Sequence, residues 1–97
     1  MNQPAFKSWP PTMREIASEV AAAHGLSFDD LLGRSHLAPV SAARQEAFAR
    51  CWEHRAYSLP QIGAFFHRDH TTVLYGIGRH RDRMPQLDAL ASALEAA

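Results

Sequence analysis

Apolar residues recur at helical spacing in successive segments of the chain, separated by short stretches of proline, glycine and polar residues. The pattern predicts an all-α protein, a compact bundle of about five to six helices. The helices are expected over residues 12–24, 26–32, 41–54, 58–66 and 69–85, and over the last twelve residues. In that last segment Leu87, Leu90 and Leu94 share one face, which predicts a short amphipathic helix lying on the domain's own core.

Side chains that cap helices mark several of the expected helix starts. Thr12 and Glu15 have the spacing of a capping box, in which each side chain bonds the backbone N–H of the other residue. Ser58 and Gln61 repeat this spacing, and Ser27 is a further candidate N-cap. These positions fix where three of the helices should begin.

The third expected helix follows a loop over residues 34–43. One face of this helix is apolar and carries Ala47, Phe48, Cys51 and Trp52. Four charged side chains are left largely outward, those of Arg44, Glu46, Arg50 and Glu53.

Residues 57–80 predict two helices joined by a tight turn. The first carries an apolar stripe, and the pattern breaks at His67 and Arg68. Asp69 then stands where it can cap a second helix, whose inner side carries Val73 and Ile77. This is the layout of a helix-turn-helix, in which polar side chains at the start of the second helix reach base edges in the major groove.

A six-residue motif at the start of the second helix resembles the signature of the C-terminal DNA-binding domain of DnaA, the bacterial replication initiator. The motif is Arg68-Asp69-His70-Thr71-Thr72-Val73. The flanking residues 58–63, SLPQIG, and the upstream pair Arg44-Gln45 fit the same pattern at the family's spacing. The likeness extends without an obvious gap over about residues 13–84.

The resemblance implies sequence-specific binding to double-stranded DNA at DnaA-box-like sites, by one copy of the chain. Such a domain would regulate replication initiation or transcription. The residues implied to read bases are Asp69, His70, Thr71 and His36. Those implied to bind phosphates are Arg44, Gln45, Ser58, Leu59, Pro60, Arg68, Thr72 and Arg79.

Two positions depart from the family pattern. The family's loop before the third helix is usually rich in basic residues, and His36 stands where an arginine enters the minor groove. A neutral histidine offers one N–H donor where an arginine offers several. The turn lacks the family's usual glycine, so that His67 is expected to take the positive backbone angle φ there.

The length of 97 residues predicts one domain, with residues 1–11 as a flexible tail and residues 12–97 as the DnaA-like domain. The formal net charge is zero but is unevenly distributed. Residues 34–83 hold eight arginines against four acidic residues, a net charge of +4, whereas residues 1–33 and 84–97 each carry −2. The segment with the motif is therefore the basic one, as DNA binding requires.

Other classes of protein fit the sequence less well. No phosphate-cradling loop is present, and we expect no nucleotide, cofactor, metal or catalytic activity. Cys51, His54, His67 and His70 match no zinc pattern. A single cysteine, no membrane-spanning run and no signal-peptide pattern together predict a cytoplasmic, nucleoid-associated protein. The alternative is a protein-interaction module that kept this fold and lost DNA binding, which the zero net charge and the depleted loop favour.

Overall fold

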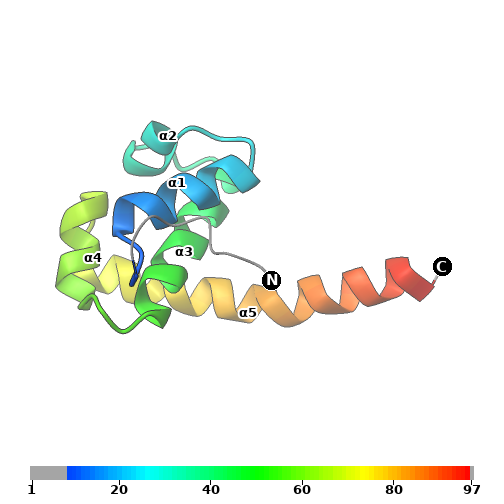
Figure 1. Cartoon of the computed structure of the whole chain (residues 1–97). Coiled ribbons are helices and arrows are strands. Elements are labelled where there is room, and N and C mark those ends of the chain that lie inside the picture. The colour runs from blue at the N-terminus through cyan, green and yellow to red at the C-terminus, as the bar shows by residue number, and fades with distance from the viewer. Residues whose placement is uncertain (1–8, 97) are drawn as a thin grey trace.

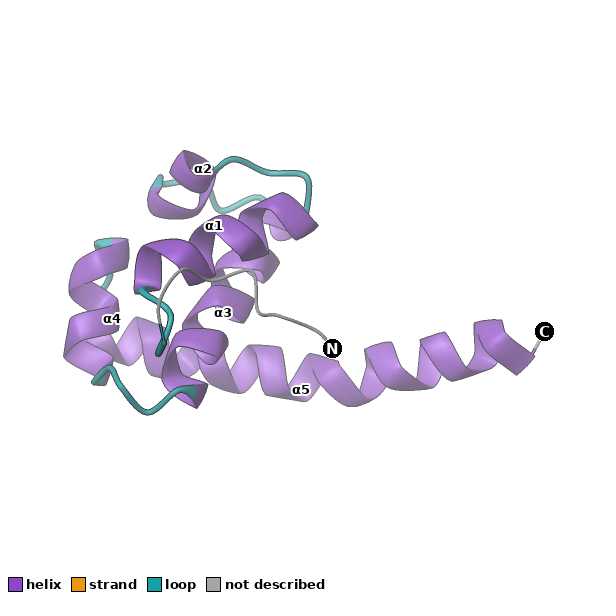
Figure 2. Ribbon diagram, in the orientation of Figure 1, coloured by secondary structure: helices purple, strands orange, loops and turns teal. Residues whose placement is uncertain are grey.

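The computed structural model describes residues 9–96, and five helices account for most of them (Figures 1 and 2). No strand occurs in this part of the chain, so the all-α prediction is confirmed. The helices are α1 (Met13–Ala23), α2 (Phe28–Leu32), α3 (Ala38–Glu53), α4 (Leu59–Phe66) and α5 (His70–Ala96).

Local capping chemistry sets three of the helix starts. The Thr12 hydroxyl accepts a hydrogen bond from the Glu15 amide over 3.1 Å, and the Glu15 carboxylate accepts one from the Thr12 amide over 3.0 Å. The same reciprocal box forms at Ser27 and at Ser58. Each box satisfies two backbone donors that a helix start leaves without partners. The predicted caps are therefore confirmed.

Helix α3 occupies the centre of the bundle and contacts each of the other four helices. Its Phe48 ring meets the Phe66 ring of α4 edge to face, with 5.1 Å between the ring centres. Val73 and Ile77 of α5 are buried in this core. Their burial confirms the inner side predicted for the second helix of the pair.

Helix α3 begins at Ala38, three residues before the predicted start, so the loop prediction for residues 34–43 was wrong. Pro39 lies in the first turn of the helix. A proline there loses no hydrogen bond, because the first amides of a helix have no intrahelical acceptor, and its fixed φ suits the helix. The irregular segment before α3 is therefore only residues 34–37.

The C-terminal prediction was wrong in two respects. Helix α5 runs without interruption through Pro85, instead of ending there and giving way to a separate short helix. A proline removes one intrahelical bond, and the alanine-rich sequence that follows favours the helix strongly enough to continue it. The second half of α5 also projects away from the bundle instead of covering it, and Leu90 and Leu94 are exposed (Figure 1).

Residues 9–11 lie against the bundle. Pro11 is buried, and its carbonyl oxygen accepts a hydrogen bond from the Tyr57 hydroxyl over 2.6 Å. The Trp9 ring meets the His54 ring edge to face. The flexible tail predicted for residues 1–11 otherwise falls on residues 1–8, which lie outside the described part of the chain.

Among the described helices, none combines the length and the apolar character needed to cross a membrane.

Candidate nucleic-acid interface

The turn between α4 and α5 is tight because two backbone segments come very close. His67 takes the left-handed conformation, with φ of 58° and ψ of 42°, as the sequence predicted. The Arg68 amide then donates to the Gly63 carbonyl oxygen over 2.8 Å. A Cβ atom at Gly63 would stand only 2.5 Å from the Arg68 carbonyl oxygen. The angle at which α5 leaves the turn thus depends on the missing side chain of Gly63.

Asp69 caps α5 and organises its first turn. Its Oδ1 atom accepts hydrogen bonds from the Thr71 amide over 2.8 Å and from the Thr71 hydroxyl over 2.6 Å. These two bonds lower the pKa of the Asp69 carboxyl, so that the group is ionised at neutral pH. The His70 ring nitrogen Nδ1 lies 3.6 Å from the same oxygen.

The three residues predicted to read bases at this helix start are exposed together. The side chains of Asp69 and His70 are 65% and 57% exposed, and Thr71 is exposed as well. All the contacts above use Oδ1 of Asp69, which leaves Oδ2 as an acceptor for a donor such as the cytosine amino group. The Thr71 hydroxyl proton is committed to Asp69, so this side chain offers a methyl group and an acceptor oxygen.

A small pocket of about 160 Å³ adjoins this helix start and gathers several of the predicted contacts. It joins the loop before α3, α3 itself, the turn and α5, elements that are far apart in sequence. We call it the basic pocket. It is lined by His36, Ser41, Arg44, Gln45, Phe48, Arg68, Thr72, Tyr75 and Gly76. Five of these residues carry predicted base or phosphate contacts, and the fold brings all five together.

Close contact between α3 and α5 forms the floor of the basic pocket. A Cβ atom at Gly76 would lie 2.7 Å from the Phe48 ring and 3.3 Å from the Gln45 side chain. Without that Cβ, α5 approaches α3 closely enough for Arg83 to donate to the Gln45 side-chain oxygen over 2.7 Å. The Gln45 amide group is therefore oriented by α5, with its NH₂ left as the donor for an anion.

Arg44 is placed differently from the sequence prediction of an outward side chain. The residue is only 5% exposed, and its guanidinium donates to four backbone carbonyl oxygens over 2.7–3.2 Å. The acceptors belong to Asp30, Leu31, Gly33 and Ser35. Burial, and then the charge of Arg68, lower the pKa of Arg44. Arg44 thus fastens the loop that carries His36 to α3.

Arg68 links the turn to the same loop. Its guanidinium donates to the Gly33 carbonyl oxygen over 2.6 Å and to the Phe66 carbonyl oxygen over 3.0 Å. The residue is half-buried and lines the basic pocket. Its charge therefore stands next to that of Arg44, and both residues line the pocket.

The remaining predicted phosphate contacts lie outside the basic pocket. Ser58, Leu59 and Pro60 line a separate depression at the start of α4. The Ser58 amide is used by the Gln61 side chain and Pro60 has no amide, so Leu59 carries the N–H that is left for a phosphate. Arg79 is exposed further along α5, beside Arg83.

Sequence reasoning gave no role in binding to three further residues that the fold brings to the interface. Tyr75, which is 65% exposed, and Ser41 of α3 both line the basic pocket, and Leu74, next to Tyr75 in the chain, is 56% exposed. Tyr75 lies one helical turn from Thr71 and Thr72, a spacing that could have suggested a shared face.

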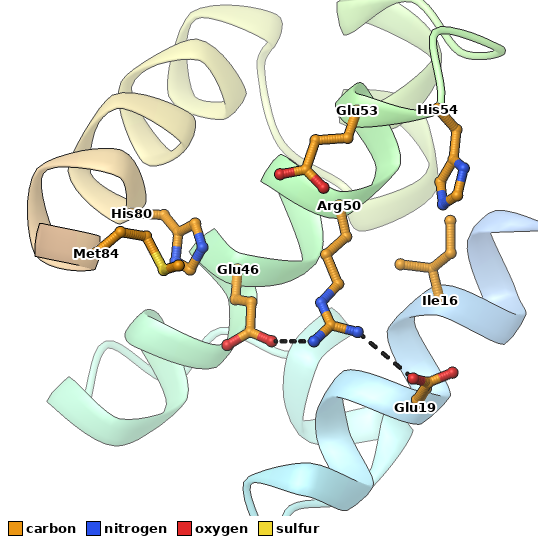
Figure 3. A pocket seen from close by; sticks show the side chains of 8 residues that line it. All are labelled: Ile16, Glu19, Glu46, Arg50, Glu53, His54, His80 and Met84. Carbon is orange, nitrogen blue, oxygen red and sulfur yellow. Dashed lines mark hydrogen bonds and ion pairs between the residues drawn. The ribbon is translucent and has the colours of Figure 1, made fainter. Parts of the chain in front are cut away.

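A second pocket, of about 510 Å³, opens between α1, α3 and α5 and differs from the basic pocket in charge (Figure 3). Its lining includes the carboxylates of Glu19, Glu46 and Glu53. Arg50 bridges two of them, at 3.1 Å from Glu46 and 3.5 Å from Glu19. With three carboxylates against one arginine, this pocket is unsuited to a DNA phosphate. Helix α3 therefore separates an acidic pocket from the basic one.

The cysteine and histidines weighed as metal ligands are spread out in space. Cys51 is buried in the core, which raises the pKa of its thiol to about 12, whereas His67 and His70 are exposed at the turn. No group of three potential ligands comes together in the part of the chain that the structure describes.

These observations define a small all-α domain of the helix-turn-helix, DNA-binding class. The model of the bacterial dnaA protein helix-turn-helix family matches residues 13–79, and the chain belongs to that family. The resemblance read from the motif at residues 68–73 is thus confirmed.

Curated relatives carry the name chromosomal replication initiator protein DnaA. The chain is 41% identical over 68 residues to that of Tropheryma whipplei, strain Twist, 47% over 62 residues to that of Clavibacter sepedonicus, and 42% over 73 residues to that of Cutibacterium acnes. These matches cover 63–74% of this chain but only 13–15% of the relatives' own length. No solved structure matches the chain.

Proposed function

We propose that this domain binds double-stranded DNA in a sequence-specific manner at DnaA-box-like sites, one chain to each site. The observation that carries the proposal is the exposed run Asp69-His70-Thr71 at the start of α5, directly beside a basic pocket. Base-reading groups and phosphate-binding groups are thereby offered to one duplex at the same time.

Within this proposal α5 enters the major groove by its first turn. Oδ2 of Asp69 accepts from a cytosine amino group, the Thr71 methyl contacts a thymine methyl, and His70 donates to or accepts from a base edge. Gln45, Arg68, Thr72 and Arg79 bind phosphates, together with Leu59 through its amide. Arg44 contributes its positive charge to the phosphate site from beneath the surface. His36 contacts the minor groove.

The family membership supports a role in replication initiation or in transcription near such sites. The described residues offer no nucleotide-binding loop, so this part of the chain acts by occupying DNA rather than by consuming a nucleotide. Acting on chromosomal DNA places the domain at the nucleoid in the cytoplasm. It has no need of a catalytic group, a metal or a cofactor for this work.

A binding titration with a labelled DnaA-box duplex and with a scrambled duplex of the same composition tests the proposal. We expect the box to bind about 10³-fold or more tightly than the scrambled duplex at physiological salt. His70→Ala and Thr71→Ala should each cost about 1–3 kcal/mol on the box and relax the preference at one or two base pairs. Equal binding to both duplexes would refute specific recognition.

The second candidate function is a protein-interaction module that kept the fold and lost specific DNA binding. Its support is the exposed apolar pair Leu74 and Tyr75 on α5, together with the zero net charge. Absence of binding to either duplex at low salt would favour this second function, because even non-specific DNA binding survives under those conditions.

A further inference from the structure

The second half of α5 is a helix without a partner in the described structure. From Met84 onward every described side chain of α5 is exposed, and Figure 1 shows this half extending beyond the bundle. Met84, Leu90 and Leu94 are 41%, 59% and 71% exposed. The match to the DnaA family ends at residue 79, before this segment begins.

Such a segment gains little from standing alone in water. Residues 84–96 extend for about 20 Å, and isolated helices of this length are marginal even when rich in alanine. Pro85 removes one intrahelical bond within the segment. Burying the apolar side chains against a partner would add the stability that this segment lacks on its own.

The distribution of charge along α5 favours a second copy of the chain as that partner. Residues 84–97 carry two acidic residues and no basic one, whereas residues 79–83 carry three arginines and one aspartate. An antiparallel pair of α5 helices brings the acidic end of each next to the basic section of the other. A parallel pair would place like charges side by side, which is unfavourable.

We propose that two chains associate through an antiparallel pairing of their α5 extensions. In the pairing that places Met84 opposite Leu94 of the second copy, Glu95 falls opposite Arg83. Leu90 flanks the seam, and the two globular parts lie at opposite ends of the helix pair. The paired extensions form a smaller contact than the interfaces of stable dimers, which bury about 1,200–2,000 Å². The association is therefore weak and reversible.

Sedimentation velocity on the DNA-free chain, from about 10 μM to about 1 mM, measures the association directly. We expect the average mass to rise with concentration from that of one 10.8 kDa chain towards that of two. Leu94→Glu should hold the chain as a monomer. Ala89→Glu, which adds the same charge on the opposite side of the helix, should associate as the unmodified chain does.

A charge-reversal pair distinguishes the antiparallel arrangement from other contacts. Glu95→Arg and Arg83→Glu should each weaken association at least threefold, and the double variant should recover most of the loss, because the opposed charges are restored in exchanged positions. Circular dichroism of each variant checks that α5 remains helical.

The mass of a single chain at every concentration would overturn the proposal and leave the exposed face to a different protein. Equal effects of Leu94→Glu and Ala89→Glu would overturn it as well, and so would a double variant weaker than both single ones. All these measurements are made without DNA, so they stand apart from the outcome of the DNA titrations.

Discussion

Arg44 and Arg68 donate hydrogen bonds to the same acceptor, the carbonyl oxygen of Gly33, over 3.2 Å and 2.6 Å. Neither guanidinium forms an ion pair with a carboxylate within the residues that the structure describes. Two positive charges held side by side repel each other, and an anion placed between them offsets that repulsion. This pair supports the proposed phosphate site, and it also joins the loop to the turn.

Replacing Arg44 by methionine should destabilise the fold by about 2–4 kcal/mol, since it removes a donor from four carbonyl oxygens at the end of α2 and in the loop that follows. Urea unfolding measures the change. Arg79→Met, at an exposed position, should stay within about 0.5 kcal/mol. The loss of stability in Arg44→Lys should fall between those of Arg44→Met and Arg79→Met, because a lysine cannot reproduce the planar fork of donors of an arginine. Lower DNA affinity with unchanged stability in Arg44→Met would show that the side chain acts as a phosphate contact alone.

Replacement by alanine should change the stability of the fold in opposite directions at Gly63 and at Gly78. A Cβ at Gly63 meets the Arg68 carbonyl oxygen at 2.5 Å, so Gly63→Ala should cost about 1–3 kcal/mol of stability. A Cβ at Gly78 meets nothing within 4 Å, and Gly78→Ala should stabilise the exposed helix by about 0.5–1 kcal/mol. Measuring the free energy of unfolding of each variant tests both expectations. A neutral Gly63→Ala would mean that the turn relaxes easily.

Stability should fall as the pH drops below about 6.5, in part because of His80. Burial is the largest cause that lowers the pKa of this ring; Arg83 and Arg50 lower it further, whereas Glu46 and Glu53 raise it. The unfolded chain then takes up the proton at a higher pH than the folded chain does, so protonation favours unfolding.

Unfolding midpoints measured between pH 7.5 and pH 5.5 report this loss. His80→Gln should make the decline shallower while leaving stability at pH 7.5 nearly as it was. A decline of the same steepness in His80→Gln would assign the effect to another group.

DNA affinity should rise when His36 is replaced by arginine, because an arginine brings a permanent charge and several N–H donors to a narrow minor groove. His36 is exposed and lines the basic pocket. His36→Ala should lower the affinity. If neither variant changes the affinity, the loop does not reach the groove.

Arg79→Ala should weaken binding to specific and scrambled duplexes alike, because a phosphate contact carries no sequence information. The slope of log K against log salt should become shallower by about 1. Arg81→Ala removes the same charge from a side of α5 turned away from Arg79 and should change the slope less. Loss of affinity for the specific duplex alone would contradict the phosphate assignment.

The sequence predicted those parts of the fold that depend on neighbours in the chain. The capping boxes at Thr12 and Ser58, the left-handed His67 and the core positions Val73 and Ile77 each follow from residues within one or two helical turns. The DnaA-like motif predicted the class of protein for the same reason, since its residues are contiguous.

For Arg44 and for the basic pocket, the deciding partner is distant in the sequence. Arg44 is buried because it meets carbonyl groups 9–14 residues earlier in the chain, and no spacing rule signals such a bond. Pro85 is a different case, because the alanine-rich sequence that follows it outweighs the local rule that a proline ends a helix. The basic pocket depends on the closeness of Gly76 to Phe48, which only the packing of α3 against α5 reveals.

Because Cys51 is buried, the reactivity of the chain's single thiol reports on the opening of the helix bundle. A thiol with a pKa raised to about 12 and no access to solvent reacts negligibly with an alkylating reagent while the bundle stays closed. The rate of labelling therefore measures how often the folded bundle opens, and no probe has to be added to the molecule. A ligand that binds only the folded form slows labelling in proportion to its occupancy. The labelling rate of Cys51 can therefore be used to measure the binding of any ligand that binds only the folded form.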